Sequence, residues 1–142
     1  MNKNKSPLIS VIIPTYNESE TIRDTVDHLR AWSDILEIIV VDGGSSDGTV
    51  HLVEPEVRLI HAPRGRASQM NEGARLASGE ILLFLHSDTR LPGNFLKQLE
   101  HALSDSGVVG GAFKVKIDQP GLFFYLASLG SNLRAAATGI YF

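Results

Sequence analysis

The sequence predicts an α/β sandwich with a mainly parallel sheet, and two observations support this fold class. Short apolar runs rich in β-branched residues alternate along the 142-residue chain with segments whose apolar residues recur at helical spacing. Such alternation is typical of parallel strands joined by right-handed crossovers. The first four apolar runs are also followed by polar loops, and ligands of such sheets bind beyond the carboxyl ends of the strands. A chain of this length fits one domain, which we expect to cover residues 1–142.

The first half of the chain begins with a buried strand at 8–14, LISVIIP. A helix is expected within residues 17–32, where Asn17 and Glu20 have the spacing of a capping box. Its apolar residues at helical spacing are Ile22, Val26 and Leu29. The next expected elements are a strand at 36–41, a short helix from Asp47 or Thr49 to Val53, and a strand at 57–62.

The second half repeats this pattern. A helix is expected within residues 65–79, with Gly79 as its C-terminal stop. Strand 80–86 is apolar for five consecutive residues, as a strand covered on both faces would be. Pro92 is expected to start another helix, and residues 108–118 to return as a strand. The predicted apolar faces are Ala67, Met70, Ala74 and Ala77 in the first helix, and Phe95, Leu96, Leu99 and Leu103 in the second.

Composition narrows the class of ligand. The formal net charge of −3 carries no long-range field that would attract nucleic acid or an anionic membrane, so local groups or a metal must hold any anionic ligand. The absence of cysteine excludes disulfides and thiolate metal sites and agrees with a reducing, cytoplasmic location. The apolar segment 122–129 is too short to span a bilayer and is expected to form a buried or interfacial helix.

Several common nucleotide and hydrolase motifs are missing. The first strand is followed by PTYNE, which lacks the glycines of a dinucleotide-binding turn. Residues 43–49 have the glycine spacing of a P-loop but not its lysine. Neither H-E-x-x-H nor G-x-S-x-G occurs. The four polar loops PTYNE, DGGSSDGT, APRGRAS and HSDTRLP are therefore the strongest indication of a site.

Three segments in order carry a family resemblance: SVIIPTYNE, EIIVVDGGSSDGT and GRASQMNEGARLASGEILLFLHSDTRLP. With them the chain resembles the donor-binding half of glycosyltransferase family 2, which has the GT-A fold. It is most similar to the subgroup of radical-SAM/selenodomain-associated transferases. The resemblance covers residues 8–142.

The resemblance implies that a nucleoside pocket is lined by Pro14, Thr15, Tyr16, Asn17 and Glu18, and that Asp42 contacts the base. A fixed carboxylate can accept an N–H from a pyrimidine edge. Alternatively, Asp42 starts a turn, Asn17 and Asp47 cap helices, and Glu18 only favours a helix N-terminus.

Arg64 and Arg66 precede the fourth helix and suit a diphosphate, although a solvated basic turn is the alternative. Gln69 and Asn71 are weaker candidates, since helix surfaces carry such residues routinely. In the family, the place of HSDT usually holds D-x-D, whose last aspartate binds a divalent cation between the phosphates. Asp88 keeps that position, which implies Mg²⁺ or Mn²⁺. His86 replaces the first aspartate and is a metal ligand, a hydrogen-bond donor to ribose, or structural.

By the same resemblance the protein transfers sugar from a nucleotide sugar, with a UDP-sugar favoured, to an unknown acceptor with inversion. The catalytic base of the family lies on the acceptor side, so no catalytic residue is assigned. The final RAAATGIYF is typical of the start of a strand, so we expect the acceptor half to be absent. The alternative function is a non-catalytic nucleotide-binding module. Self-association and peripheral membrane contact near residues 123–125 are also expected.

Overall fold

The computed structural model describes residues 8–118 and 120–138, with side chains through residue 133. The chain divides into two compact units, of which the first ends at Pro92 and the second begins at Gly93. Each unit is described by itself.

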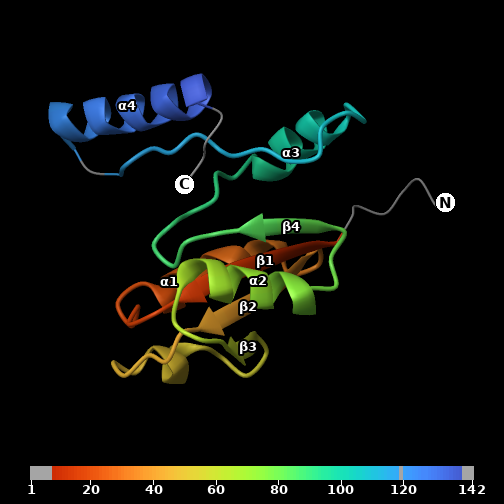
Figure 1. The fold of residues 1–142 in the computed structure, drawn as a ribbon, viewed down its shortest axis with the longest axis vertical. Helices are drawn as coiled ribbons and strands as arrows, with labels where there is room; N and C mark the ends of the chain where they lie inside the picture. Colours follow the sequence, from red (N-terminus) through yellow and green to blue (C-terminus); the bar gives the residue numbers. More distant parts are fainter. Residues whose placement is uncertain (1–7, 119, 139–142) are drawn as a thin grey trace. The chain divides into compact units, whose positions relative to one another are not determined.

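The first unit contains a four-stranded, fully parallel sheet in the order β3-β2-β1-β4 (Figure 1). The strands are β1 (Ile9–Thr15), β2 (Leu36–Asp42), β3 (Arg58–His61) and β4 (Ile81–Phe84). The predicted fold class and the four strand positions are confirmed. In the register of the sheet, Thr15 pairs with Asp42 and Asp42 pairs with His61, so the last residues of three strands lie side by side.

The core surrounds β1, because this strand buries both of its faces. Ile12 packs toward Gly73 of α2 (Arg66–Leu76), while the neighbouring Val11 and Ile13 point to the opposite face and are also fully buried. The helices of this unit are α1 (Ile22–Leu29), η1 (Arg30–Trp32), η2 (Thr49–Leu52) and α2 (Arg66–Leu76). The predicted apolar face of α1 is confirmed, since Ile22, Val26 and Leu29 are buried.

The predicted capping box at the start of α1 is wrong. The helix begins only at Ile22, after Thr21, whose side chain makes no capping hydrogen bond. Asn17 adopts a left-handed conformation with φ of 55°. Its side-chain oxygen accepts a hydrogen bond from the distant Ser46 N–H, so it is not available to a helix.

The predicted apolar face of α2 is confirmed only in part, since Ala74 and Ala77 pack against the core. Its buried residues are Gln69 and Gly73, whereas Ala67 is exposed. The helix lies across β1 and β2 (Figure 1), so close that a Cβ on Gly73 would be 2.4 Å from Ile12 Cγ2. Only a glycine fits at this contact, and Ala74 and Ala77 pack beside it against the core.

Gly79 does not end α2, which stops at Leu76 with an extended Ala77 behind it. Gly79 is required because the chain passes β1 closely, where a Cβ would be 2.6 Å from Ser10 N. The predicted coverage of both faces of β4 is likewise not observed. β4 pairs only with β1 among the described strands, and Leu82 and Phe84 remain 42% and 43% exposed.

The second unit contains α3 (Phe95–Leu103) and α4 (Leu122–Thr138). The predicted strand at 108–118 is wrong, because this segment pairs with no strand among the described residues. The backbone N–H groups of this segment bond to side chains of α4 instead. Val115 N donates to Asn132 Oδ1, and Ile117 N donates to Ser128 Oγ.

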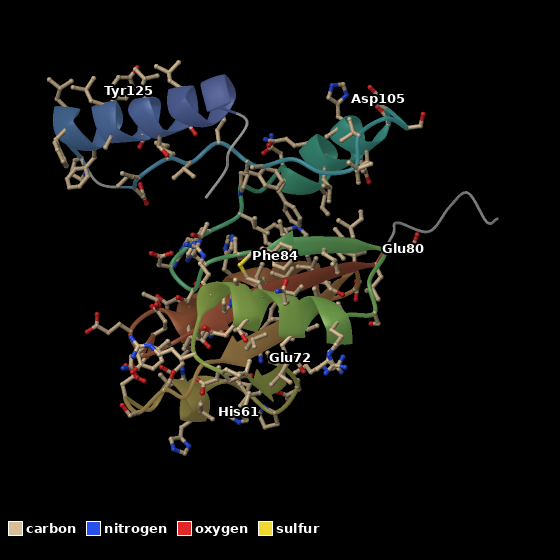
Figure 2. The ribbon with its side chains drawn as sticks, in the orientation of Figure 1. His61, Glu72, Glu80, Phe84, Asp105 and Tyr125 are labelled. Atoms are coloured by element: carbon tan, nitrogen blue, oxygen red, sulfur yellow. The ribbon has the colours of Figure 1, made fainter. Side chains whose placement is uncertain are left out.

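The helix expected around 122–129 is present in α4, and α3 begins three residues after Pro92. Of the final segment predicted as a strand start, residues 134–138 are helical and residues 139–142 lie outside the described residues. Among the described residues, no helix has the length and apolar character that crossing a membrane requires. Figure 2 shows Tyr125 on the outside of α4, where its side chain is exposed.

Candidate functional site

The loops that follow β1 and β2 are joined to each other by backbone-to-side-chain hydrogen bonds. Asn17 N donates to Ser45 Oγ at 2.9 Å, and Ser46 N donates to Asn17 Oδ1 at 2.9 Å. One step further along the chain, Glu18 N donates to Thr49 Oγ1 at 2.8 Å. Reciprocal bonds of this kind fix two loops that have no regular structure of their own, so residues 14–18 are held at the carboxyl edge of the sheet.

Asp47 extends this connection. Its carboxylate accepts hydrogen bonds from Ser19 N at 3.0 Å and from both the N–H and the hydroxyl of Thr49. The hydrogen bond from the Thr49 hydroxyl is the main reason that the pKa of Asp47 is far below its ordinary value. Asp47 is therefore an ionised anchor between the two loops and the start of η2.

Asp42 lies beneath the surface, with only 2% of its area exposed. It accepts hydrogen bonds from Gly44 N at 2.9 Å and Ser45 N at 3.1 Å, and His61 Nδ1 is 3.5 Å away. Burial raises the pKa of Asp42, but the hydrogen bonds from Ser45, Gly44 and His61 outweigh it and lower the pKa. In this arrangement Asp42 shapes the turn after β2, and the base contact expected of it stays a prediction.

A cavity of about 230 Å³ opens at the carboxyl ends of β1 and β4. It brings together all of the predicted nucleotide-binding residues except Asn17 and Asp42. Its full lining is Pro14, Thr15, Tyr16, Glu18, Arg64, Gly65, Arg66, Gln69 and His86.

Two arginines give this cavity a cationic wall. Gly65 has a φ of 144°, which only glycine adopts readily, and it precedes the first residue of α2. The guanidinium carbon of Arg64 lies 3.9 Å from the centre of the Tyr16 ring, a cation–π contact that orients both side chains. Arg66 lies at the N-terminus of α2, where backbone N–H groups and the helix dipole favour an anion. We call residues 64–66 the arginine turn.

Gln69, one of the two weaker candidates from the sequence, lines this cavity. Although it was expected on a helix surface, it is 4% exposed. Its Nε2 donates to the carbonyl oxygens of Thr15 at 2.7 Å and Val41 at 2.8 Å, and Gly65 N donates to its Oε1 at 3.3 Å. The only sequence signal for its burial is its i, i+4 spacing from Gly73.

His86 also lines the cavity, while Asp88 is exposed just outside it. Burial and the nearby Arg66 lower the pKa of His86, against the opposing effect of Asp88 and Glu18. In the described part of the chain, no three His, Cys, Asp or Glu side chains are grouped closely enough to hold a metal alone. One carboxylate beside an imidazole suits a divalent ion that takes its remaining ligands from phosphate and water.

Helix α1 holds the loop that carries His86 and Asp88. The buried Thr25 hydroxyl donates to the Ser87 carbonyl at 2.5 Å, and His28 Nε2 is 3.0 Å from the Leu91 carbonyl. Thr25 and His28 are one helical turn apart on the same face. The loop after β4 is thereby fixed at two points that flank Asp88.

The parallel sheet and the polar cavity at its carboxyl edge define an α/β protein of the GT-A type. The chain belongs to glycosyl transferase family 2, whose model matches residues 10–134.

Relatives and solved structures agree with this family. An uncharacterized glycosyltransferase of Mycobacterium tuberculosis is 34% identical over 122 residues, which are 80% of this chain and 47% of that protein. A mannosyltransferase from Pyrobaculum calidifontis, solved with GDP-Man and Mn²⁺, is 28% identical with a TM-score of 0.61 over 91% of this chain and 41% of that one. Glucosyl-3-phosphoglycerate synthase from Mycobacterium tuberculosis was solved with Mn²⁺, UDP and phosphoglyceric acid. It is 27% identical with a TM-score of 0.60, over 69% of this chain and 39% of that one. The chain thus spans less than half the length of each of these proteins.

Proposed function

We propose that this chain binds a nucleoside-diphosphate sugar together with Mg²⁺ or Mn²⁺ and serves sugar transfer to an acceptor with inversion. The observation that carries the proposal is the cavity itself, in which the aromatic ring of Tyr16 and the guanidinium groups of the arginine turn meet beside the loop of Asp88. Two proteins of similar structure were solved with Mn²⁺ and either UDP or GDP-Man, which supports this class of ligand. We favour a UDP-sugar, and within the family the motif order favours the radical-SAM/selenodomain-associated subgroup.

In this proposal the segment 14–18 lines the nucleoside pocket, and Arg64 and Arg66 bind the diphosphate oxygens through charge-assisted hydrogen bonds. Asp88, with His86 beside it, would hold the divalent ion. When bound, such an ion neutralises the charge that develops on the departing nucleoside diphosphate. Without it, Asp88 would repel the diphosphate that the arginines attract.

The catalytic base is not assigned. Of the described residues that line the cavity, Glu18 alone carries a carboxylate, and it accepts a hydrogen bond from Thr21 Oγ1 at 3.2 Å. The alternative function is a non-catalytic nucleotide-binding module, and in either case we propose that residues 1–142 belong to one domain. Appearance of free UDP on incubation with a UDP-sugar and an acceptor would decide for the transferase.

The ligand class is tested by thermal unfolding with UDP, UDP-glucose and GDP, each with and without Mn²⁺. A ligand present at about 100 times its Kd should stabilise the fold by about 2.7 kcal/mol. Asp88→Ala should remove the metal-dependent part of the shift. Asp34→Ala is the matched control, since Asp34 is exposed and precedes β2 at the opposite, amino end of the sheet. A panel in which no nucleotide changes the melting temperature would overturn the proposal.

The proposal includes a cytoplasmic location, self-association and peripheral membrane contact. The last two rest on large apolar side chains exposed on α4, among them Phe123, Tyr125 and Leu133. Light scattering and flotation with anionic vesicles measure these two properties separately.

A further inference from the structure

We infer that Gln69 is a positioning residue, which ties the arginine turn to the ends of β1 and β2 and so sets the two guanidinium groups for an anionic ligand. The inference rests on the proposed nucleotide-binding function only for the identity of that ligand. The positioning itself concerns the protein alone.

The Gln69 amide bridges two strands at the point where their ladder ends. Its two N–H groups are directed to Thr15 O at 2.7 Å and Val41 O at 2.8 Å, carbonyls on neighbouring parallel strands. A glutamine amide has two donors, and both are used here. At 4% exposure this side chain therefore presents no free donor to a ligand.

The amide oxygen of Gln69 makes the third connection. It accepts the Gly65 N–H at 3.3 Å, while the backbone N–H of Gln69 donates to the Gly65 carbonyl at 2.9 Å. The second of these is the first regular hydrogen bond of α2, and the first satisfies the N–H of the residue that precedes the helix. Because Gly65 lies between Arg64 and Arg66, its orientation determines where both arginine side chains leave the backbone.

The two residue types closest to glutamine do not supply these contacts. Glutamate lacks donors for the two carbonyls, and asparagine is shorter by one methylene group. The space around the amide is also closed, since a Cβ on Gly43 would lie 3.1 Å from the Gln69 amide atoms. A glycine at position 43 thus leaves room for this glutamine in the turn that follows β2.

The decisive variant is Gln69→Met, which keeps the length of the side chain and removes its hydrogen bonds. The fold should survive, because Thr15 O still accepts the Gly43 N–H and Val41 O still accepts the Thr15 hydroxyl. The matched control is Ser10→Ala at the other end of β1. Ser10 is fully buried and bonded to Glu37 and to Gly79 N, so this variant also loses buried hydrogen bonds, far from the cavity.

Two measurements separate positioning from general destabilisation. Amide hydrogen exchange at Gly65 should accelerate by about tenfold or more in Gln69→Met and stay unchanged in Ser10→Ala. Calorimetric titration with UDP and Mn²⁺ should give a Kd raised by about tenfold in Gln69→Met alone. Equal effects of the two variants, or unchanged exchange at Gly65 in Gln69→Met, would overturn the inference.

A second perturbation covers the case in which Gln69→Met fails to fold. Gly43→Ala keeps the glutamine but presses a methyl group against its amide, and it should accelerate exchange at Gly65 in the same direction. Should the wild-type chain bind no nucleotide, the proposed function fails while the exchange measurement still decides the role of Gln69. Exchange at Gly65 that is insensitive to both variants would show that the turn is held by other contacts.

Discussion

Replacing Gly73 by alanine is expected to destabilise the first unit, although alanine is the better helix former. In a helix interior this substitution gains about 1 kcal/mol from backbone propensity. At this position, however, the added methyl group would lie 2.4 Å from Ile12 Cγ2 and 3.0 Å from Val41 Cγ2. Both neighbours are fully buried, so neither can move aside without disturbing the core. Overpacking costs roughly 1–3 kcal/mol, and a 2.4 Å approach belongs at the upper end, so the net loss should be about 2 kcal/mol.

Urea unfolding followed by the fluorescence of Trp32 measures this loss. Trp32 is the single tryptophan of the chain and belongs to the first unit. With a slope of about 1–2 kcal/mol per M, the midpoint should fall by about 1–2 M. Gly130→Ala in α4 is the matched control, because its methyl group would meet no atom within 4 Å and should leave the Trp32 transition in place. A Gly73→Ala midpoint equal to or above that of the wild type would refute the close approach of α2 to the sheet.

Three further perturbations test the site. Asp42→Asn should reduce the amount by which the free energy of unfolding falls as the pH is lowered. Burial raises the pKa of Asp42, but hydrogen bonds hold it below 3.8, so its contribution is complete above that pH and declines below it. Urea midpoints between about pH 7 and pH 3 measure the slope, and identical slopes contradict this reasoning. Arg64→Lys should raise the Kd for UDP about tenfold. An ammonium group neither stacks flat on Tyr16 nor binds phosphate with two parallel donors. A Kd that calorimetry finds unchanged would contradict this role of Arg64. Thr25→Val should weaken Mn²⁺ binding at Asp88 in the presence of UDP, as measured by electron paramagnetic resonance, whereas Thr25→Ser, which keeps the hydroxyl, should not.

The elements that sequence patterns predicted best are those whose burial is set by local periodicity. β1 and β2 are continuous apolar runs because both faces of the sheet are covered there, and α1 buries the residues at helical spacing. The polar loops after these strands converge because parallel strands end at one edge. Six of the residues that the sequence predicted for nucleotide binding therefore line one cavity. Their convergence could be predicted without knowledge of contacts between distant parts of the chain.

Other features depend on partners that are distant in the sequence, which local patterns do not encode. The alanines of α2 indicated its apolar face, but the closest contact is made by Gly73, since the approach of Ile12 leaves no space for a side chain. The alternation in residues 108–118 is that of a strand, yet its backbone bonds to Asn132 and Ser128 of a helix. Gln69 is polar and was expected at the surface, and only the ends of two strands explain its burial.

An acidic chain can present a cationic cavity wall because several nearby carboxylates are bound to hydrogen-bond donors or to another arginine outside the cavity. Asp42 and Asp47 accept hydrogen bonds from backbone N–H groups within the loops. Glu72 of α2, labelled in Figure 2, forms an ion pair with Arg75. The net charge of −3 is therefore a poor guide to the local field, which the arginine turn dominates at the cavity wall. The carboxylate of Asp88 is exposed and accepts a hydrogen bond from Thr89 Oγ1 at 3.2 Å. An exposed carboxylate beside a cationic cavity is what a divalent ion shared with a diphosphate would require.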